Sequence, residues 1–271
     1  KFATGLDYPT TMYFVGEDIL VLEKNTGKVI RIQDSGVLYN EPALDVPVSY
    51  QSESGLLGIA SVSNHVFLYF TEALSGVDTF SIENSKNAVY QYDWNGEKLT
   101  NPILIKEFPA LIDHHHSGIM TKGLNNEVYF AIGDQGQYTA SQNIPINPTQ
   151  NHEIGSIFKI NTENNNNIEL IAMGIRNSFG LDVDPITGHL WQTENGVNEY
   201  DEIINFAFYD KEIILPESGI ISHRTQIIKK EYKKYENLIS VQIIEDAVGV
   251  ANCEIGKLNQ TFDKSTKLLI Y

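Results

Sequence analysis

Short apolar runs separated by polar turns make up most of the chain, and helical periodicity is scarce. The runs are rich in Val, Ile, Tyr and Phe, and Gly, Asn, Asp and Pro stand between them. This pattern is typical of strands joined by turns. One order recurs along the chain: a strand, a polar turn, a second strand that ends at an acidic residue, then a loop and a further strand. The sequence therefore predicts an all-β protein built from repeated antiparallel units.

The second strand of this unit can be placed four times. It covers residues 18–24, 66–72, 127–134 and 189–195. The acidic residues that close these strands are Glu23, Glu72, Asp134 and Glu194, separated by 49, 62 and 60 residues. A third strand follows in three units, at 28–32, 87–94 and 155–160. Four meanders of this size indicate a β-propeller with long loops, and a β-sandwich with coincidental spacing is the alternative.

Composition limits the class of protein. The chain has 271 residues, of which 42% are hydrophobic and 10% aromatic, so a disordered chain is excluded. A single Cys excludes a disulfide framework and a thiolate zinc site within one chain. No stretch approaches the ~18 apolar residues of a transmembrane helix, so we expect no transmembrane segment.

The formal net charge of −16 is unevenly distributed. Residues 1–208 contain 26 acidic and 10 basic residues, whereas 209–271 contain nine of each. Acidic chains lack the cationic surface that nucleic acids and anionic membranes require, so neither is expected as a partner. The shift in composition places a boundary near residue 208.

The segment 113–118, Asp-His-His-His-Ser-Gly, is the first candidate for chemistry. Neighbouring side chains of extended backbone point to opposite sides, so the three histidines cannot all face one point. One of them is suited to take a proton near neutral pH. A solvated polar loop, or a run that binds metal adventitiously, is the alternative interpretation.

The segment 174–181, Gly-Ile-Arg-Asn-Ser-Phe-Gly-Leu, holds the only Arg between Arg31 and Arg224. A guanidinium among small and apolar residues suits a carboxylate, phosphate or quinone oxygen. A structural ion pair with a nearby acid would explain it equally well.

Two further segments carry weaker signals. Residues 193–202 combine carboxylates, amides and a Gly that can present oxygens to calcium, although the spacing is not that of an EF-hand and a polar turn is the alternative. Glu53 precedes Gly-Leu-Leu-Gly and could reach a central channel. No Walker loop, dinucleotide fingerprint or Gly-x-Ser-x-Gly elbow occurs in the sequence.

These segments occur together in one order that resembles a known family. The sequences GLDYPTTMYF, DILVLEKNTGKVIRI, SESGLLGIA, HHSG, VYFAIGDQG, GSIFKI, GIRNSFGLDVDPITGHLWQTENG and DEI resemble the glucose/sorbosone dehydrogenases over about residues 2–206. These are quinoproteins that oxidise aldose sugars, and the likeness is to prokaryotic members, archaeal ones among them. The Arg-Asn-Ser-Phe-Gly-Leu element with Glu-Asn-Gly is specific, whereas an isolated His-x-Ser-Gly is not.

The resemblance implies a six-bladed β-propeller, formed by residues 1–271 as one domain, that binds pyrroloquinoline quinone (PQQ) and calcium. His115 would be the general base that takes the anomeric hydroxyl proton while hydride passes to the quinone. Arg176 and Asn177 would contact the cofactor, with Arg176 stabilising charge on the quinone oxygens, and Glu53 would add a polar contact. The calcium ligands would be the carbonyls of Gly196 and Val197, helped by Asn195; the family usually has Pro in place of Val197.

The partners implied are an aldose sugar and an external electron acceptor, at an extracytoplasmic location. Residues 1–208 would form the family-like blades and 209–271 a divergent closing region, so the last blades are expected to be short, incomplete or divergent. The Trp element and the cationic clamp that the family places after the Asp-Glu-Ile motif have no recognisable counterpart; Arg224, Lys229 and Lys230 are available, but no motif selects them.

One rival function follows from that departure, and a third hypothesis stands beside it. A non-catalytic propeller could bind a protein or glycan through the same face, because quinone carboxylates without counter-charges are costly to bury. A propeller hydrolase or lactonase with a calcium-bound water is the third hypothesis.

Overall fold

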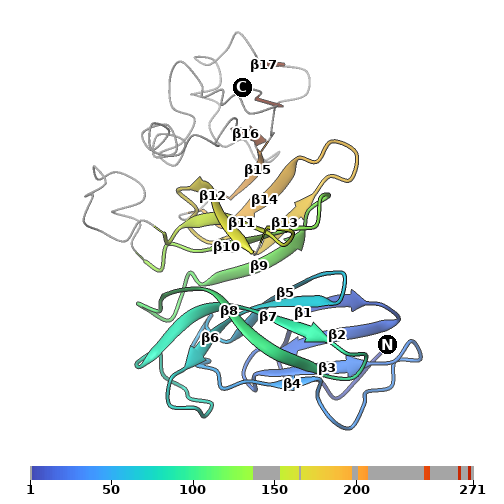
Figure 1. The fold of residues 1–271 in the computed structure, drawn as a ribbon. Coiled ribbons are helices and arrows are strands. Elements are labelled where there is room, and N and C mark those ends of the chain that lie inside the picture. Colours follow the sequence, from blue (N-terminus) through green and yellow to red (C-terminus); the bar gives the residue numbers. More distant parts are fainter. Residues whose placement is uncertain are drawn as a thin grey trace.

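A computed structural model describes residues 2–136, 153–164, 166–196 and 201–206, together with three short strands further along the chain (Figure 1). Four antiparallel sheets follow one another in sequence order. In the first three sheets all consecutive strands pair, and the fourth departs from this order only among its last strands, so the predicted all-β repeat is confirmed.

The first two sheets have four strands each. Sheet 1 contains β1 (Pro9–Val15), β2 (Asp18–Glu23), β3 (Lys28–Ile32) and β4 (Leu44–Asp45). Sheet 2 contains β5 (Leu56–Val62), β6 (His65–Ala73), β7 (Ser85–Trp94) and β8 (Leu99–Pro109).

The next two sheets continue the order. Sheet 3 contains β9 (Ser117–Lys122), β10 (Glu127–Ile132), β11 (Ser156–Asn161) and β12 (Asn167–Met173). Sheet 4 contains β13 (Gly180–Val183), β14 (Leu190–Glu194), β15 (Glu202–Phe206), β16 (Val241–Ile244), β17 (Phe262–Asp263) and β18 (Leu268–Leu269). The predicted second strands correspond to β2, β6, β10 and β14, and the predicted third strands to β3, β7 and β11.

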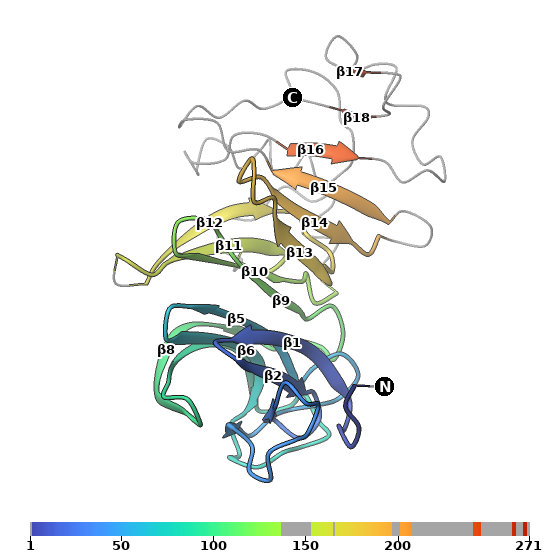
Figure 2. The same ribbon diagram turned by 90° about the vertical axis from the view of Figure 1, so that its right-hand side faces the viewer.

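The first strands of the sheets lie next to one another. β1 contacts β5, β5 contacts β9, and β9 contacts β13, so the sheets are arranged one after another about these inner strands (Figure 2). Between β1 and β5, the hydroxyls of Thr10 and Thr11 donate to the carbonyls of Leu56 (3.0 Å) and Leu57 (2.7 Å). This arrangement is propeller-like and differs from two sheets packed face to face in a sandwich.

The number of sheets differs from the expected six blades, because the described residues form four. Beyond residue 208, the described strand β16 pairs with β15, with Phe206 opposite Val241, and β18 pairs with β16. These strands therefore extend sheet 4 and do not begin another sheet. Arg224, Lys229 and Lys230 lie outside the described residues.

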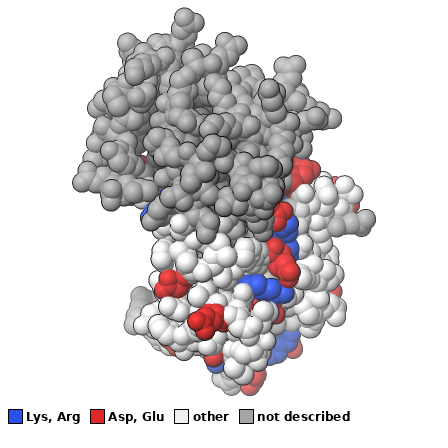
Figure 3. Space-filling model, turned by 90° about the vertical axis from the view of Figure 1, so that its left-hand side faces the viewer, with Lys and Arg blue, Asp and Glu red and all other residues white. Residues whose placement is uncertain are grey.

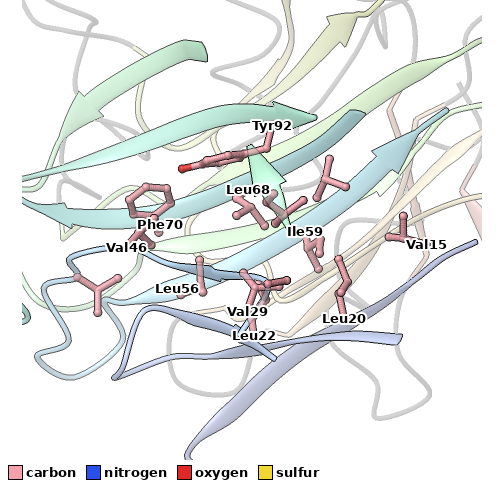
Figure 4. Packing of buried hydrophobic residues seen from close by; sticks show 14 residues of the cluster. Val15, Leu20, Leu22, Val29, Val46, Leu56, Ile59, Leu68, Phe70 and Tyr92 are labelled. Atoms are coloured by element: carbon pink, nitrogen blue, oxygen red, sulfur yellow. The ribbon is translucent and has the colours of Figure 1, made fainter. Parts of the chain in front are cut away.

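Three apolar cores fill the spaces between successive sheets. Figure 4 shows the core between sheets 1 and 2, where Leu20 and Leu22 of β2 face Leu56 and Ile59 of β5. Burial of each such side chain contributes about 1.5–3 kcal/mol. Because both faces of sheets 2 and 3 are covered, the second strands β6 and β10 read as nearly continuous apolar runs.

Charged side chains are paired across strands at the surface. The Lys159 Nζ lies 3.6 Å from the Glu127 Oε1 and 2.8 Å from the Glu169 Oε2. The Lys86 Nζ lies 2.9 Å from the Glu107 Oε2. Basic and acidic groups lie side by side on part of the face in Figure 3. In the described part of the chain, no helix has the length and apolar character needed to cross a membrane.

Candidate active site

The candidate residues meet at one edge of sheets 2 to 4. In each sheet the first two strands are antiparallel, so the start of the first strand lies beside the end of the second. Ser117 at the start of β9 pairs with Ile132 at the end of β10, and Gly180 at the start of β13 pairs with Thr193 near the end of β14. The loops before β5, β9 and β13 and those after β10 and β14 therefore share this edge.

His115 and Asp134 form a buried pair at this edge. The His115 Nδ1 lies 2.7 Å from the Asp134 Oδ1, and only 8% of the His115 side chain and 1% of the Asp134 side chain are exposed. Burial raises the pKa of Asp134, and the hydrogen bond from His115 opposes this shift. A carboxylate that accepts from Nδ1–H fixes the tautomer with the lone pair on Nε2, the form that a general base requires.

The backbone presents His115 in an uncommon conformation. Its φ of 58° lies in the left-handed region, which is costly for a residue with a side chain. The segment that follows β10 approaches His115 closely, since a Cβ on Gly133 would lie 2.1 Å from the His115 carbonyl oxygen. Gly at position 133 therefore allows Asp134 to reach the imidazole.

Glu53 joins the loops that open sheets 2, 3 and 4. Its Oε2 accepts the backbone N–H of His115 (2.7 Å) and the side-chain amide of Asn177 (3.0 Å). The Asn177 Oδ1 in turn accepts the backbone N–H of Ser117 (3.1 Å). The carboxylate of Glu53 thus fixes the relative positions of His115 and Asn177.

Glu194 fixes the Arg-Asn segment from the other side. Its buried Oε1 accepts the backbone N–H groups of Arg176 (2.8 Å) and Asn177 (3.0 Å), and its Oε2 accepts the Gln192 amide (2.6 Å). The Arg176 guanidinium donates through Nη1 to the Asn195 carbonyl (2.7 Å). Its buried Nε has no hydrogen-bond partner among the described residues.

The loop expected to bind calcium is described only in part. Asn195 is exposed, its N–H donates to the Asn177 carbonyl (3.0 Å), and the Gly196 N–H donates to the Asp201 Oδ1 (3.0 Å). Val197 lies outside the described residues. Within the described residues, no three His, Cys, Asp or Glu side chains are grouped so that they could hold a metal ion. The expected ligands are carbonyl and amide oxygens, which suit calcium, so the donor chemistry fits as far as the loop is described.

The three consecutive histidines point into different surroundings, so they do not all face one point. The alternation of an extended strand is not the reason, because the backbone at His115 is left-handed and not extended. The His114 side chain is 48% exposed and contacts Asp113. His116 is fully buried, with Nε2 2.8 Å from the Ile112 carbonyl and Nδ1 3.0 Å from the Asn87 Oδ1. Burial lowers the pKa of His116 to about 4, so it is neutral near pH 7. Only His115 belongs to the site.

The structure brings the predicted residues together at this edge: Glu53, His115, Arg176, Asn177, Asn195 and Gly196. Two residues that the sequence analysis did not assign to the site, Asp134 and Glu194, lie with them. The signal for both was present, since each closes the second strand of a unit. Glu23 and Glu72 hold the same place but bind backbone, hydroxyl and lysine groups of their own sheets. An acidic residue at the end of the second strand therefore has a structural role in sheets 1 and 2 and lies in the candidate site in sheets 3 and 4.

A family model described as "Glucose / Sorbosone dehydrogenase" matches residues 6–207. The chain is also similar to quinoprotein glucose dehydrogenase B of Acinetobacter calcoaceticus, with 26% identity over 220 residues. That match covers 68% of this chain and 45% of the relative.

Solved structures agree on the fold. The PQQ-bound aldose sugar dehydrogenase of Streptomyces coelicolor matches with a TM-score of 0.57 and 24% identity, over 74% of this chain and 60% of that one. A glucose dehydrogenase structure matches with a TM-score of 0.60 and 21% identity, over 74% and 61%. The chain thus spans less than half the length of the curated relative and about three fifths of these structures.

Proposed function

The chain belongs to the glucose/sorbosone dehydrogenase family, and from this premise we propose that it oxidises aldose sugars at the anomeric carbon to lactones, using PQQ. The observation that carries the proposal is the His115–Asp134 pair, held by Glu53 next to Asn177 and the Arg-Asn segment. Oxidation of a hydroxyl-bearing carbon needs a base that takes the hydroxyl proton, and a buried histidine with a fixed tautomer can be that base. It also needs a positive group to stabilise the charge that develops on the hydride acceptor, and the Arg-Asn segment carries one.

His115 acts on the substrate hydroxyl. Its Nε2 takes the proton of the anomeric O–H as the C–H bond breaks, and the carbon–oxygen bond becomes the lactone carbonyl. Asp134 stabilises the imidazolium that forms, since its carboxylate faces the Nδ1 at 2.7 Å. Bound PQQ supplies the acceptor for the hydride.

Arg176 and Asn177 are the residues proposed to hold the quinone. The Arg176 Nε is a buried donor without a hydrogen-bond partner in the part of the chain that the structure describes, and a quinone oxygen would satisfy it. Glu194 fixes the backbone of both residues, so their side chains are preorganised. Arg224, Lys229 and Lys230 are available as counter-charges for the cofactor carboxylates, but no motif selects them and they lie outside the described residues.

The proposal also covers the calcium site, the number of blades, and the electron acceptor and location of the protein. Asn195, Gly196 and Val197 would hold calcium through oxygen atoms. A six-bladed propeller would need two blades beyond the four described sheets. An external acceptor would reoxidise the cofactor at an extracytoplasmic location.

Titration with PQQ tests the proposal directly. We expect the purified protein to bind PQQ with micromolar or tighter affinity in the presence of calcium, and to reduce a dye when aldoses are added. Calorimetry measures the first and absorbance the second. A folded protein that binds no PQQ would overturn the proposal and favour the non-catalytic propeller.

Replacing Arg176 by Met should weaken PQQ binding by about 10- to 100-fold, because a charge-assisted contact is lost. Calorimetric titration measures the change. The matched control is Lys122→Met, which removes an exposed cation from the far end of β9 and should leave the affinity unchanged. Equal affinities for Arg176→Met and the wild type would remove Arg176 from the cofactor site.

Replacing Asp134 by Asn should lower turnover by about 100-fold, since an amide stabilises the imidazolium much less than a carboxylate does. PQQ affinity should change less than twofold. Asp93→Asn is the matched control, because Asp93 faces the Nδ1 of His65 at 3.0 Å on sheet 2, away from the site. Steady-state dye reduction measures both variants, and an unchanged turnover for Asp134→Asn would contradict the role of the pair.

A further inference from the structure

A lysine of sheet 1 holds the loop that presents Glu53 to the site. Lys24 directly follows β2, and its ammonium donates to the carbonyls of Ser52 (2.8 Å), Ser54 (2.9 Å) and Tyr50 (3.3 Å). An ammonium has three N–H donors and no acceptor. The three carbonyls therefore use its whole hydrogen-bonding capacity.

The loop needs a cation at this point. Three carbonyl dipoles that converge on one position repel one another unless a positive group lies between them. The backbone is also constrained, with φ of 51° at Ser52 and 136° at Gly55. A Cβ on Gly55 would lie only 2.4 Å from the Lys24 carbonyl oxygen. The loop thus closes tightly around Lys24.

The loop leads from Lys24 to the catalytic pair. Glu53 lies between Ser52 and Ser54, the two residues whose carbonyls are nearest to the Lys24 ammonium. Its backbone N–H donates to the Asp113 carbonyl (2.9 Å), and its carboxylate accepts the His115 N–H and the Asn177 amide. A displacement of this loop would move the acceptor away from both groups.

We propose that Lys24 is a positioning residue, which sets the Glu53 carboxylate and, through it, the backbone at His115 and the side chain of Asn177. The link runs from sheet 1 to the loops that open sheets 3 and 4. Its catalytic consequence rests on the proposed function, whereas its effect on His115 does not.

The His115 amide supplies a readout that needs no cofactor. In Lys24→Met, which keeps the length of the side chain and removes the ammonium, we expect amide hydrogen exchange at His115 to accelerate by about 10-fold. Lys24→Arg keeps a cation with several donors and should remain within about threefold of the wild type. Exchange is measured residue by residue by NMR.

Two controls separate this effect from general destabilisation. Lys122→Met removes an exposed lysine and should leave the amide exchange rates of both His115 and Phe130 unchanged. The amide of Phe130, fully buried in β10, reports global opening and should exchange at the wild-type rate in Lys24→Met. His115 exchange within twofold of wild type in Lys24→Met, or an equal acceleration at Phe130, would overturn the proposal.

Cofactor binding gives the second readout. Lys24→Met should bind PQQ about 10-fold more weakly, because Asn177 loses its fixed partner. Lys24→Arg should restore the affinity to within about threefold of wild type. If the wild-type protein binds no PQQ, the proposed function fails, and the exchange comparison still decides the role of Lys24.

Discussion

Replacing His115 by Gln should lower the rate of aldose oxidation by about 1,000-fold, because general base catalysis contributes about 10²- to 10⁴-fold. Gln approximates the size of imidazole, and its side chain cannot take a proton near neutral pH. The Asp134 carboxylate and the Glu53 contact to the backbone N–H of residue 115 remain in place. Dye reduction in the presence of PQQ and calcium measures the rate.

The neighbouring histidine provides the matched control. His114→Gln changes the same residue type one position away, where the side chain is 48% exposed and faces Asp113. We expect its rate to stay within twofold of wild type. Full activity in His115→Gln, with PQQ bound, would show that another group takes the proton.

Replacing Glu194 by Ala should lower the free energy of unfolding by about 3 kcal/mol, because buried donors left without partners cost about 1–3 kcal/mol each. The carboxylate accepts the backbone N–H groups of Arg176 and Asn177 and the Gln192 amide, and it is 1% exposed. Urea unfolding measures the change. PQQ affinity should fall as well, because the Arg-Asn segment loses its anchor.

A surface glutamate calibrates this loss. Glu163 is exposed and its carboxylate accepts the Asn126 side-chain amide (2.8 Å) at the surface, so Glu163→Ala should change stability by less than about 0.5 kcal/mol. Glu194→Gln should give an intermediate loss, since one oxygen still accepts from the backbone while the new amide faces the Gln192 amide. A loss below about 1 kcal/mol for Glu194→Ala would contradict the anchoring role.

The hydrophobic pattern by itself determined the sheets. Strands buried on both faces read as continuous apolar runs, and polar turns divide them, so the order of residues alone placed the second and third strands of the units. The expected six blades came from the family resemblance and not from this pattern. The described residues form four sheets, and the described strands after residue 208 extend sheet 4.

The pattern of residues by itself indicated the motifs that meet at one edge of the sheets, among them the histidine run 113–118 and the segment with Arg176 and Asn177, and the family resemblance then selected His115 and Glu53. The residue pattern could not decide which of the three adjacent histidines is buried beside a carboxylate, or that Asp134, Glu194 and Lys24 support the proposed site. Those contacts join residues 19 to 124 positions apart, or pass through backbone N–H and carbonyl groups that every residue carries. Only the packing of sheets 1 to 4 around their inner strands brings these groups together, because strand order at one edge decides which loops meet.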